Sequence, residues 1–136
     1  MSSILNQSGR QTPCRELGLI GVPVKAGAVL LAGFAAVVDE SGYAVAASAS
    51  AKLTYLGRYE EAVDNTSGGN GDVYVLVRTD SAFQFENSAT DPVTQASFGK
   101  VCYLQDGETV AATDGMGKLS KAGRVVGIDE NGVWVE

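Results

Sequence analysis

The acidic pairs Asp39-Glu40, Glu60-Glu61 and Asp129-Glu130 are the residues of this chain that could first suggest acid–base chemistry. Adjacent side chains on a strand point to opposite faces of a sheet, so the two carboxylates of each pair cannot work together as a general acid and base. The chain contains no histidine, which excludes Ser-His and Cys-His nucleophile pairs and the usual imidazole metal sites. We therefore predict a protein that is not an enzyme and has no catalytic residue, metal ion or cofactor.

The two cysteines and the short glycine motifs do not predict a ligand site. Cys14 and Cys102 lack the spacing of a metal site or a disulfide framework, so we expect free thiols in a reducing compartment. Gly99-Lys100 and Gly117-Lys118 lack the earlier glycine and the following Ser or Thr of a phosphate-binding loop. The run Asp114-Gly-Met-Gly has too few carboxylates for a calcium loop and is predicted to be a turn.

Charge is distributed unevenly along the chain. The 136 residues fit one domain and carry a formal charge of −6 with a pI near 4.6, which argues against a nucleic-acid partner. Within the first 25 residues, however, Arg10, Arg15 and Lys25 are opposed only by Glu16. A mildly basic leader thus precedes an acidic body.

The segment of residues 25–50 has two incompatible interpretations. Its lysine, apolar run and Ala-Ser-rich end are typical of a secretory signal, but Asp39-Glu-Ser-Gly42 is also a good hairpin turn. The apolar run Ala26–Val38 is shorter than the roughly 20 residues of a membrane-spanning helix, and the acidic pair lies where a signal would be small and neutral. We therefore predict strands over Ala28–Val38 and Tyr43–Ala47, and no membrane segment.

Turn signals divide the rest of the chain into short strands. Two strands are expected over Lys52–Tyr59 and Val73–Arg78, because both segments are rich in β-branched and aromatic residues. A flexible loop without a role in the core is expected between them, at Asp64–Asp72. Asx-Gly dipeptides place further strands near residues 100–105, 108–112, 123–128 and 132–136.

One short helix interrupts this pattern. Asp91 can cap its N-terminus, Pro92 suits its first position and Gly99 suits its C-terminal cap. The predicted fold class is mainly β: a compact antiparallel β-sandwich or barrel-like (β-tulip-like) domain over residues 25–136.

A weak internal repeat connects two parts of this body. Three short motifs occur twice in the same order. The first copy is Ala26-Gly-Ala-Val29, Val45-Ala-Ala47 and Leu56-Gly57, and the second copy is Phe98-Gly-Lys-Val101, Val110-Ala-Ala112 and Val126-Gly127. Chance similarity between β-rich segments is one explanation, and two similar β units packed into one domain are the other.

Residues 1–24 form a polar, turn-rich leader that has no obvious place in the core. We predict that this leader is an extended N-terminal arm, with a frayed terminus as the alternative. The residues through which the arm is expected to bind a partner are Ile4, Leu5, Arg10, Arg15, Leu17, Leu19 and Ile20.

A set of β-scaffold motifs spans residues 25–136. The motifs are Lys25-Ala-Gly, Val45-Ala-Ala, Leu56–Thr66, Val77–Phe85, Gly99–Tyr103, Thr109–Gly115, Gly123–Asp129 and Val133-Trp-Val135. In these motifs the chain resembles the cement or decoration proteins of Mu-like and related phages and prophages, which are small head proteins encoded near the major capsid gene. The layout is also similar to the lambda-type head decoration protein, in which a polar arm precedes a helix-poor β body. The resemblance implies binding to the outside of a capsid, commonly as trimers at three-fold positions, to resist internal DNA pressure.

The sequence therefore predicts a capsid decoration protein, located on the outer surface of the virion and made in the host cytoplasm. The expected partners are the major capsid protein, bound by the arm residues above, and the protein itself as a homotrimer, with no direct nucleic acid and no membrane. A rigid β body and an arm that adds a strand to an exposed sheet edge are sufficient for this function. One alternative is another head–tail or tail component of the virion. The other is a carbohydrate-binding β module. Such a module would need a planar aromatic patch, whereas the aromatic residues of this chain are scattered along the sequence, at Tyr43, Tyr55, Tyr59, Tyr74, Tyr103 and Trp134.

Overall fold

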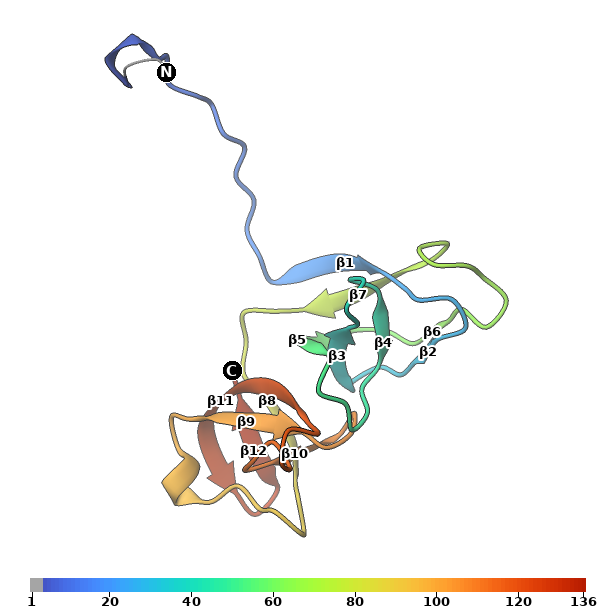
Figure 1. Cartoon of the computed structure of the whole chain (residues 1–136), viewed down its shortest axis with the longest axis vertical. Helices are drawn as coiled ribbons and strands as arrows, with labels where there is room; N and C mark the ends of the chain where they lie inside the picture. The colour runs from blue at the N-terminus through green and yellow to red at the C-terminus, as the bar shows by residue number, and fades with distance from the viewer. Residues whose placement is uncertain (1–3) are drawn as a thin grey trace.

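Frequent turns divide the chain into short, mostly antiparallel strands, which build two β lobes and a protruding N-terminal arm (Figure 1). The computed structural model describes residues 4–136. We call residues 19–78 the N-lobe and residues 83–136 the C-lobe. The mainly β, antiparallel and barrel-like fold predicted from the sequence is confirmed.

The N-lobe is a curled five-stranded sheet. Its strands, in the spatial order β1-β7-β5-β3-β4, are β1 (Leu19–Pro23), β7 (Tyr74–Arg78), β5 (Thr54–Tyr59), β3 (Ala35–Val38) and β4 (Ala44–Ala46). The two outer strands approach each other at one parallel bridge between Val24 and Ala44. A separate two-stranded sheet, β2 (Val29–Leu30) with β6 (Val63–Asp64), packs beside them.

The C-lobe is a closed five-stranded barrel. Its strands, in the spatial order β8-β12-β11-β9-β10, are β8 (Phe83–Asn87), β12 (Gly132–Val135), β11 (Ser120–Asp129), β9 (Val101–Leu104) and β10 (Thr109–Ala111). A parallel pairing between β8 and β10 closes the barrel. The strands predicted at residues 100–105, 108–112, 123–128 and 132–136 correspond to β9, β10, β11 and β12.

The two lobes have the same strand topology. In each lobe the first strand lies at one end of the order, the next two main strands form a hairpin, and the last strand inserts beside the first. The matched strands are β1 and β8, β3 and β9, β4 and β10, β5 and β11, and β7 and β12. Even the parallel contact between the first and third of these strands recurs.

The pairings also match residue by residue. Ala35 lies opposite Arg58 in the N-lobe and Val101 lies opposite Arg124 in the C-lobe, a shift of 66 positions in both strands (101 − 35 and 124 − 58). The same shift relates the β3–β4 hairpin to the β9–β10 hairpin. The hypothesis of two similar β units is therefore supported by strand pairing and not only by composition.

Backbone hydrogen bonds beside β3 and β9 show which residues are equivalent. Gly33 donates its N–H to the carbonyl of Tyr59 (2.8 Å), and Gly99 donates in the same way to Val125 (2.8 Å). The equivalent of Gly99 is therefore Gly33, and the sequence match to Gly27 was wrong.

A second pair of glycines lies where a strand passes very close to its neighbour. A Cβ atom on Gly57 would lie 2.0 Å from the carbonyl oxygen of Arg78, and one on Gly123 would lie 1.8 Å from that of Glu136. No side chain fits at such distances. Gly57 is thus equivalent to Gly123 and not, as the sequence match had it, to Gly127.

The lobes fill equivalent interior positions with different residues. Tyr59 is buried in the N-lobe where Val125 is buried in the C-lobe, and the smaller Val22 corresponds to Phe85. The large ring therefore comes from β5 in one lobe and from β8 in the other. The hydroxyl of Tyr59 donates to the carbonyl of Val45 (2.6 Å), and burial raises the pKa of Tyr59 to about 12.

The outer face of β3 and β5 packs against the C-lobe. Ala35 and Val37 belong to the same buried cluster as the C-lobe residues Phe83 and Phe85. The ring of Tyr55 meets Phe85 edge to face, with ring centres 6.3 Å apart. The body predicted as one domain thus contains two lobes that share a buried core.

The strand predicted over Ala28–Val38 is wrong, because a turn interrupts it. Gly33 adopts a φ of 85°, a conformation that favours glycine, and separates β2 from β3. The chain therefore leaves the small two-stranded sheet and enters the main sheet of the N-lobe at this point.

The helix predicted after Asp91 is also wrong; only a 3-10 turn over Gln95–Ser97 forms, capped by Thr94. The side chain of Asn87 donates a hydrogen bond to the carbonyl of the buried Val93 and accepts one from its N–H. These two backbone groups are therefore not available for the hydrogen bonds of a helix. Asp91 instead accepts hydrogen bonds from the backbone N–H and the hydroxyl of Thr113 (3.0 and 2.6 Å).

Candidate binding surfaces

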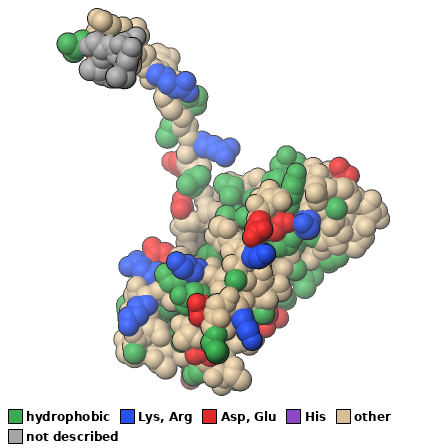
Figure 2. All heavy atoms as spheres, in the orientation of Figure 1, with side chains coloured by type: hydrophobic (Ala, Val, Ile, Leu, Met, Phe, Trp, Pro, Cys, Tyr) green, Lys and Arg blue, Asp and Glu red, His purple; other side chains and the backbone are tan. Residues whose placement is uncertain are grey.

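The N-terminal arm, residues 4–18, extends away from the N-lobe, and it protrudes clearly in the space-filling view (Figure 2). Residues 4–6 form a 3-10 turn, and residues 7–17 have no regular secondary structure. Every side chain from Leu5 to Leu17 is exposed. A polar segment of this kind cannot bury enough apolar surface to fold by itself, so its side chains face the solvent.

Five of the predicted binding residues lie on this arm. Leu5 is 90% exposed and Leu17 is 60% exposed. Arg10 donates to the hydroxyl of Thr12 (3.0 Å), and neither Arg10 nor Arg15 forms an ion pair within residues 4–136. The side chain of Ile4 lies outside the described part of the chain. The arm does not gather these residues; it spaces them along an extended chain.

The other two predicted residues, Leu19 and Ile20, belong to the sheet. The arm predicted for residues 1–24 is shorter in the structure, because Leu19–Pro23 form β1 and pair with β7. Ile20 is half-buried against the N-lobe core, whereas Leu19 remains 47% exposed. The partner strand follows about fifty positions later, so no local sequence signal marks the end of the arm.

An apolar stripe runs along the outer face of β1 and β7, where the arm joins the body. We define the stripe as Leu17, Leu19, Tyr74 and Leu76; Tyr74 is 63% exposed and Leu76 is 40% exposed. From the sequence, Tyr74 was named only among the aromatic residues of the carbohydrate-binding alternative, and Leu76 was not identified as a surface residue. Alternation with the buried Val75 and Val77 along the strand was the signal that could have identified them.

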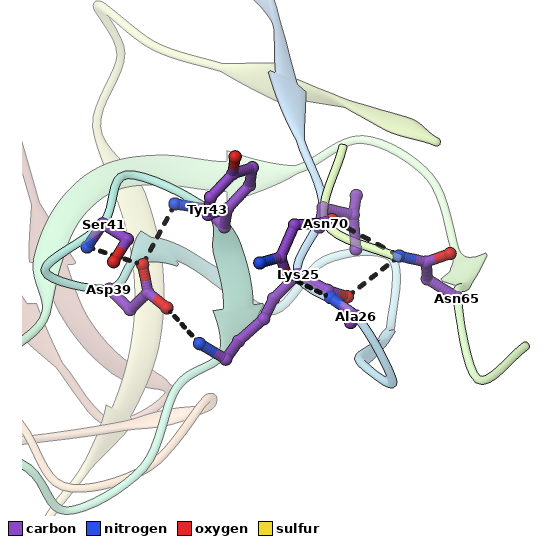
Figure 3. A network of polar contacts seen from close by, with 8 residues as sticks. Lys25, Ala26, Asp39, Ser41, Tyr43, Asn65 and Asn70 are labelled. Atoms are coloured by element: carbon purple, nitrogen blue, oxygen red, sulfur yellow. Dashed lines mark hydrogen bonds and ion pairs between the residues drawn. The ribbon is translucent and has the colours of Figure 1, made fainter. Parts of the chain in front are cut away.

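An ion pair lies near the other end of β1, away from the arm. Lys25 contacts Asp39 with 2.7 Å between Nζ and Oδ2, and Asp39 also accepts the backbone N–H groups of Ser41 and Tyr43 (Figure 3). The hydrogen bond from Lys25, followed by that from Tyr43, lowers the pKa of Asp39. This cluster fixes the β3–β4 turn against the residues that follow β1.

The loop predicted to be flexible at Asp64–Asp72 is instead tied to the body. Asn65 is 2% exposed, and its side-chain amide donates to the carbonyls of Lys25 (2.9 Å) and Gly69 (3.1 Å). Asn70 accepts the N–H of Ala26 (2.8 Å), as Figure 3 shows. A polar loop therefore has a core role here, because one buried amide satisfies several backbone groups.

A second charged cluster borders the apolar stripe. Glu60 lies between Arg58 and Arg78, with 3.0 Å between its Oε1 and the Nε of Arg78. The hydrogen bond from Arg78, followed by that from Arg58, lowers the pKa of Glu60. The two like charges on neighbouring strands are thus bridged by one carboxylate.

The thiols and carboxylates do not assemble into a metal site within residues 4–136. Cys14 is exposed on the arm, and Cys102 is buried in the C-lobe, where burial raises its pKa to about 11. No helix in the described part of the chain is long and apolar enough to cross a membrane. Comparisons with protein-family models, curated proteins and solved structures find no match for this chain.

Proposed function

We propose that this chain is a structural protein that binds the outer surface of a phage capsid and cements the shell against internal DNA pressure. The observation that carries the proposal is the arm, whose side chains from Leu5 to Leu17 are all exposed while the body behind it is a tightly paired β structure. An arm of these 13 residues can reach about 40 Å when extended. It can therefore run well beyond its own body along a neighbouring surface.

Ordering such an arm on a partner has an entropic cost of roughly 1–2 kcal/mol per residue. New backbone hydrogen bonds along a sheet edge of the capsid subunit, together with burial of Leu5 and Leu17, would offset this cost. Arg10 and Arg15 add attraction to an acidic surface, which salt weakens. A binding protein of this kind needs no active site.

The resemblance of residues 25–136 to phage decoration proteins supplies the identity of the partner. The major capsid protein is the proposed binding partner, with the protein itself as a homotrimer on the outside of the virion after synthesis in the host cytoplasm. The carbohydrate-binding alternative gains no support from the surface, because the exposed rings of Tyr74 and Trp134 lie on different lobes.

The test is binding of the purified protein to phage heads that lack it. Full-length protein should sediment with the heads, and a chain without residues 2–16 should fold but bind far more weakly. A chain in which residues 2–16 are replaced by Gly-Ser repeats of equal length is the matched control and should behave like the truncated chain. Replacing Arg10 and Arg15 by Glu should weaken binding less, and more strongly at low salt than at high salt.

Equal binding by the truncated and the full-length chain would contradict the proposal for the arm. Failure of the full-length chain to bind any head would contradict the proposed function as a whole.

A further inference from the structure

A groove opens at the junction of the two lobes, on the side of β2 and the β9–β10 turn. The hollow measures about 340 Å³. Its floor contains the buried residues Leu30 and Tyr59, and its walls contain Val29 and Leu31, which are 46% and 49% exposed. We call this hollow the junction groove. Large apolar side chains that remain exposed around a hollow indicate a surface that another chain covers.

The C-lobe side of the groove is held firmly in place. Ala35 donates its N–H to the carbonyl of Gly107 (2.8 Å), and a Cβ atom at residue 107 would lie 2.6 Å from the ring of Phe34. The β9–β10 turn, residues 105–108, therefore packs directly against the N-lobe. The groove is a fixed feature of the junction and not a gap between loosely joined parts.

Three carboxylates surround the junction groove. Asp106 and Glu108 line it directly, and Glu86 lines an adjoining hollow that shares Phe34 and Glu108 with it. All three residues are exposed, and none forms an ion pair with a cation of residues 4–136. Unpaired like charges beside an apolar surface favour a ligand that combines a cation with an apolar group.

The N-terminal arm carries this combination. Arg15 and Leu17 are two positions apart, so their side chains point to the same side of an extended chain, whereas Glu16 points to the opposite side. Both residues are exposed, and Arg15 has no ion-pair partner in the described part of the chain.

We propose that the junction groove binds the arm of a second copy of this chain, with Leu17 on the apolar floor and Arg15 beside Asp106 and Glu108. The chain's own arm cannot do so. The carbonyl of Gly18 accepts the N–H of Thr79 (2.9 Å), which holds the adjacent Leu17 at the start of β1, and no arm residue lines the groove. Two residues span at most about 7 Å, so Leu17 cannot move far from β1.

This contact goes beyond the proposed capsid binding and does not need a shell. In an assembly with this contact, Arg15 and Leu17 bind the next copy and not the shell. Residues 4–12, which include Leu5 and Arg10, remain available for the shell. An arm that enters the groove of the next copy makes a head-to-tail contact, which closes as a ring when the rotation between copies permits. Neighbouring copies would then be linked to one another as well as to the capsid shell.

Self-association of the full-length chain in solution tests this inference, measured by analytical ultracentrifugation over a range of concentrations at low salt. The wild-type chain should associate, and Arg15→Glu and Glu108→Lys should each raise the dissociation constant about tenfold or more. The double variant Arg15→Glu/Glu108→Lys, which restores opposite charges across the contact, should recover most of the lost affinity. Glu130→Lys, an equal charge change at an exposed turn, is the matched control and should have no such effect.

A wild-type chain that remains monomeric at every concentration overturns the inference. So does a double variant that associates no better than the single variants, because rescue requires that the two side chains meet. Both measurements are made without shells, so their failure is distinct from a failure of capsid binding.

Discussion

The two lobes have the same strand topology and register, but the equivalent outer face is buried in the N-lobe and exposed in the C-lobe. In the N-lobe this face carries Ala35, Val37 and Tyr55, which pack against the C-lobe. In the C-lobe the residue equivalent to Ala35 is Val101, 41% exposed, and the residue equivalent to Tyr55 is the exposed Lys121. The comparison shows that, within residues 4–136, this face makes the contact between the lobes in the N-lobe and faces the solvent in the C-lobe.

A second difference concerns the connection before the last strand of each lobe. The C-lobe joins β11 to β12 by a tight turn, whereas the N-lobe inserts residues 60–73 between β5 and β7. The insertion contains Asn65 and β6, and it binds the backbone that follows β1. The larger connection thus lies in the lobe that bears the arm, but it binds the end of β1 opposite the arm.

The strongest test of the equivalence is substitution of the matched glycines. Gly57→Ala and Gly123→Ala should each destabilise the protein by about 3 kcal/mol or more, because each new Cβ would overlap a neighbouring carbonyl oxygen. Denaturant unfolding measures the loss. Gly9→Ala, which meets no atom within 4 Å, should change little. A tolerated alanine at only one of the two positions would show that the lobes are not equivalent there.

The packing between the lobes should be nearly as sensitive. Tyr55→Ala should cost about 2–3 kcal/mol, since it removes the ring that meets Phe85. Tyr55→Phe should be neutral or stabilising, because the buried hydroxyl has no hydrogen-bond partner within residues 4–136. Thermal unfolding of the two variants distinguishes packing from hydrogen bonding. Equal losses in both variants would mean that the hydroxyl is bonded after all.

The inserted loop of the N-lobe should contribute a smaller amount. Asn65→Ala should destabilise the protein by about 2 kcal/mol, because several buried carbonyls lose their donor at once. Asn70→Ala, which removes one hydrogen bond to Ala26 at an exposed position, should cost less and serves as the control. Urea midpoints measure both changes. A neutral Asn65→Ala variant would support the flexible loop that the sequence predicted.

The ion pair of the N-lobe gives the smallest expected effect. Lys25 and Asp39 are equivalent to Ser88 and Gln105, which form a neutral hydrogen bond of 2.6 Å in the C-lobe. The lowered pKa of Asp39 adds stability above the pKa of the unfolded chain, and this stability is lost as the pH falls through the folded pKa.

The contribution of the Lys25–Asp39 ion pair to the free energy of unfolding should be below about 1 kcal/mol, because the pair lies near the surface. The pH dependence of unfolding measures this contribution. Asp39→Asn should flatten the acidic limb of the stability curve relative to the wild type. Gln105→Ala should lower stability without changing that limb, since no charge is involved. An unchanged acidic limb in Asp39→Asn would show that the pair does not contribute.

The sequence predicted the mainly β fold because turn dipeptides such as Asp106-Gly107 and Asn131-Gly132 do separate its strands. Local patterns failed where a distant partner decides the structure. Asn87 captures the backbone of Val93 in place of a helix, and Asn65 anchors a loop that is polar in composition.

The repeat illustrates the same limit. Its motifs were visible, but the shift of 66 positions follows only from the strand pairings, and matching by composition chose the wrong glycines. For the binding surfaces, polarity was enough to predict the exposed arm. The junction groove was not predictable, because Leu31 and Glu108 come from different lobes.

We propose that the two-lobed body is held on a shell by its N-terminal arm. Electron cryo-microscopy of phage heads with bound full-length protein tests it most directly. If the arm holds the body on the shell, the map will show density for the two lobes outside the shell and continuous density for residues 4–12 along the capsid subunit. Density in which the lobes contact the shell directly while the arm remains unbound would contradict it.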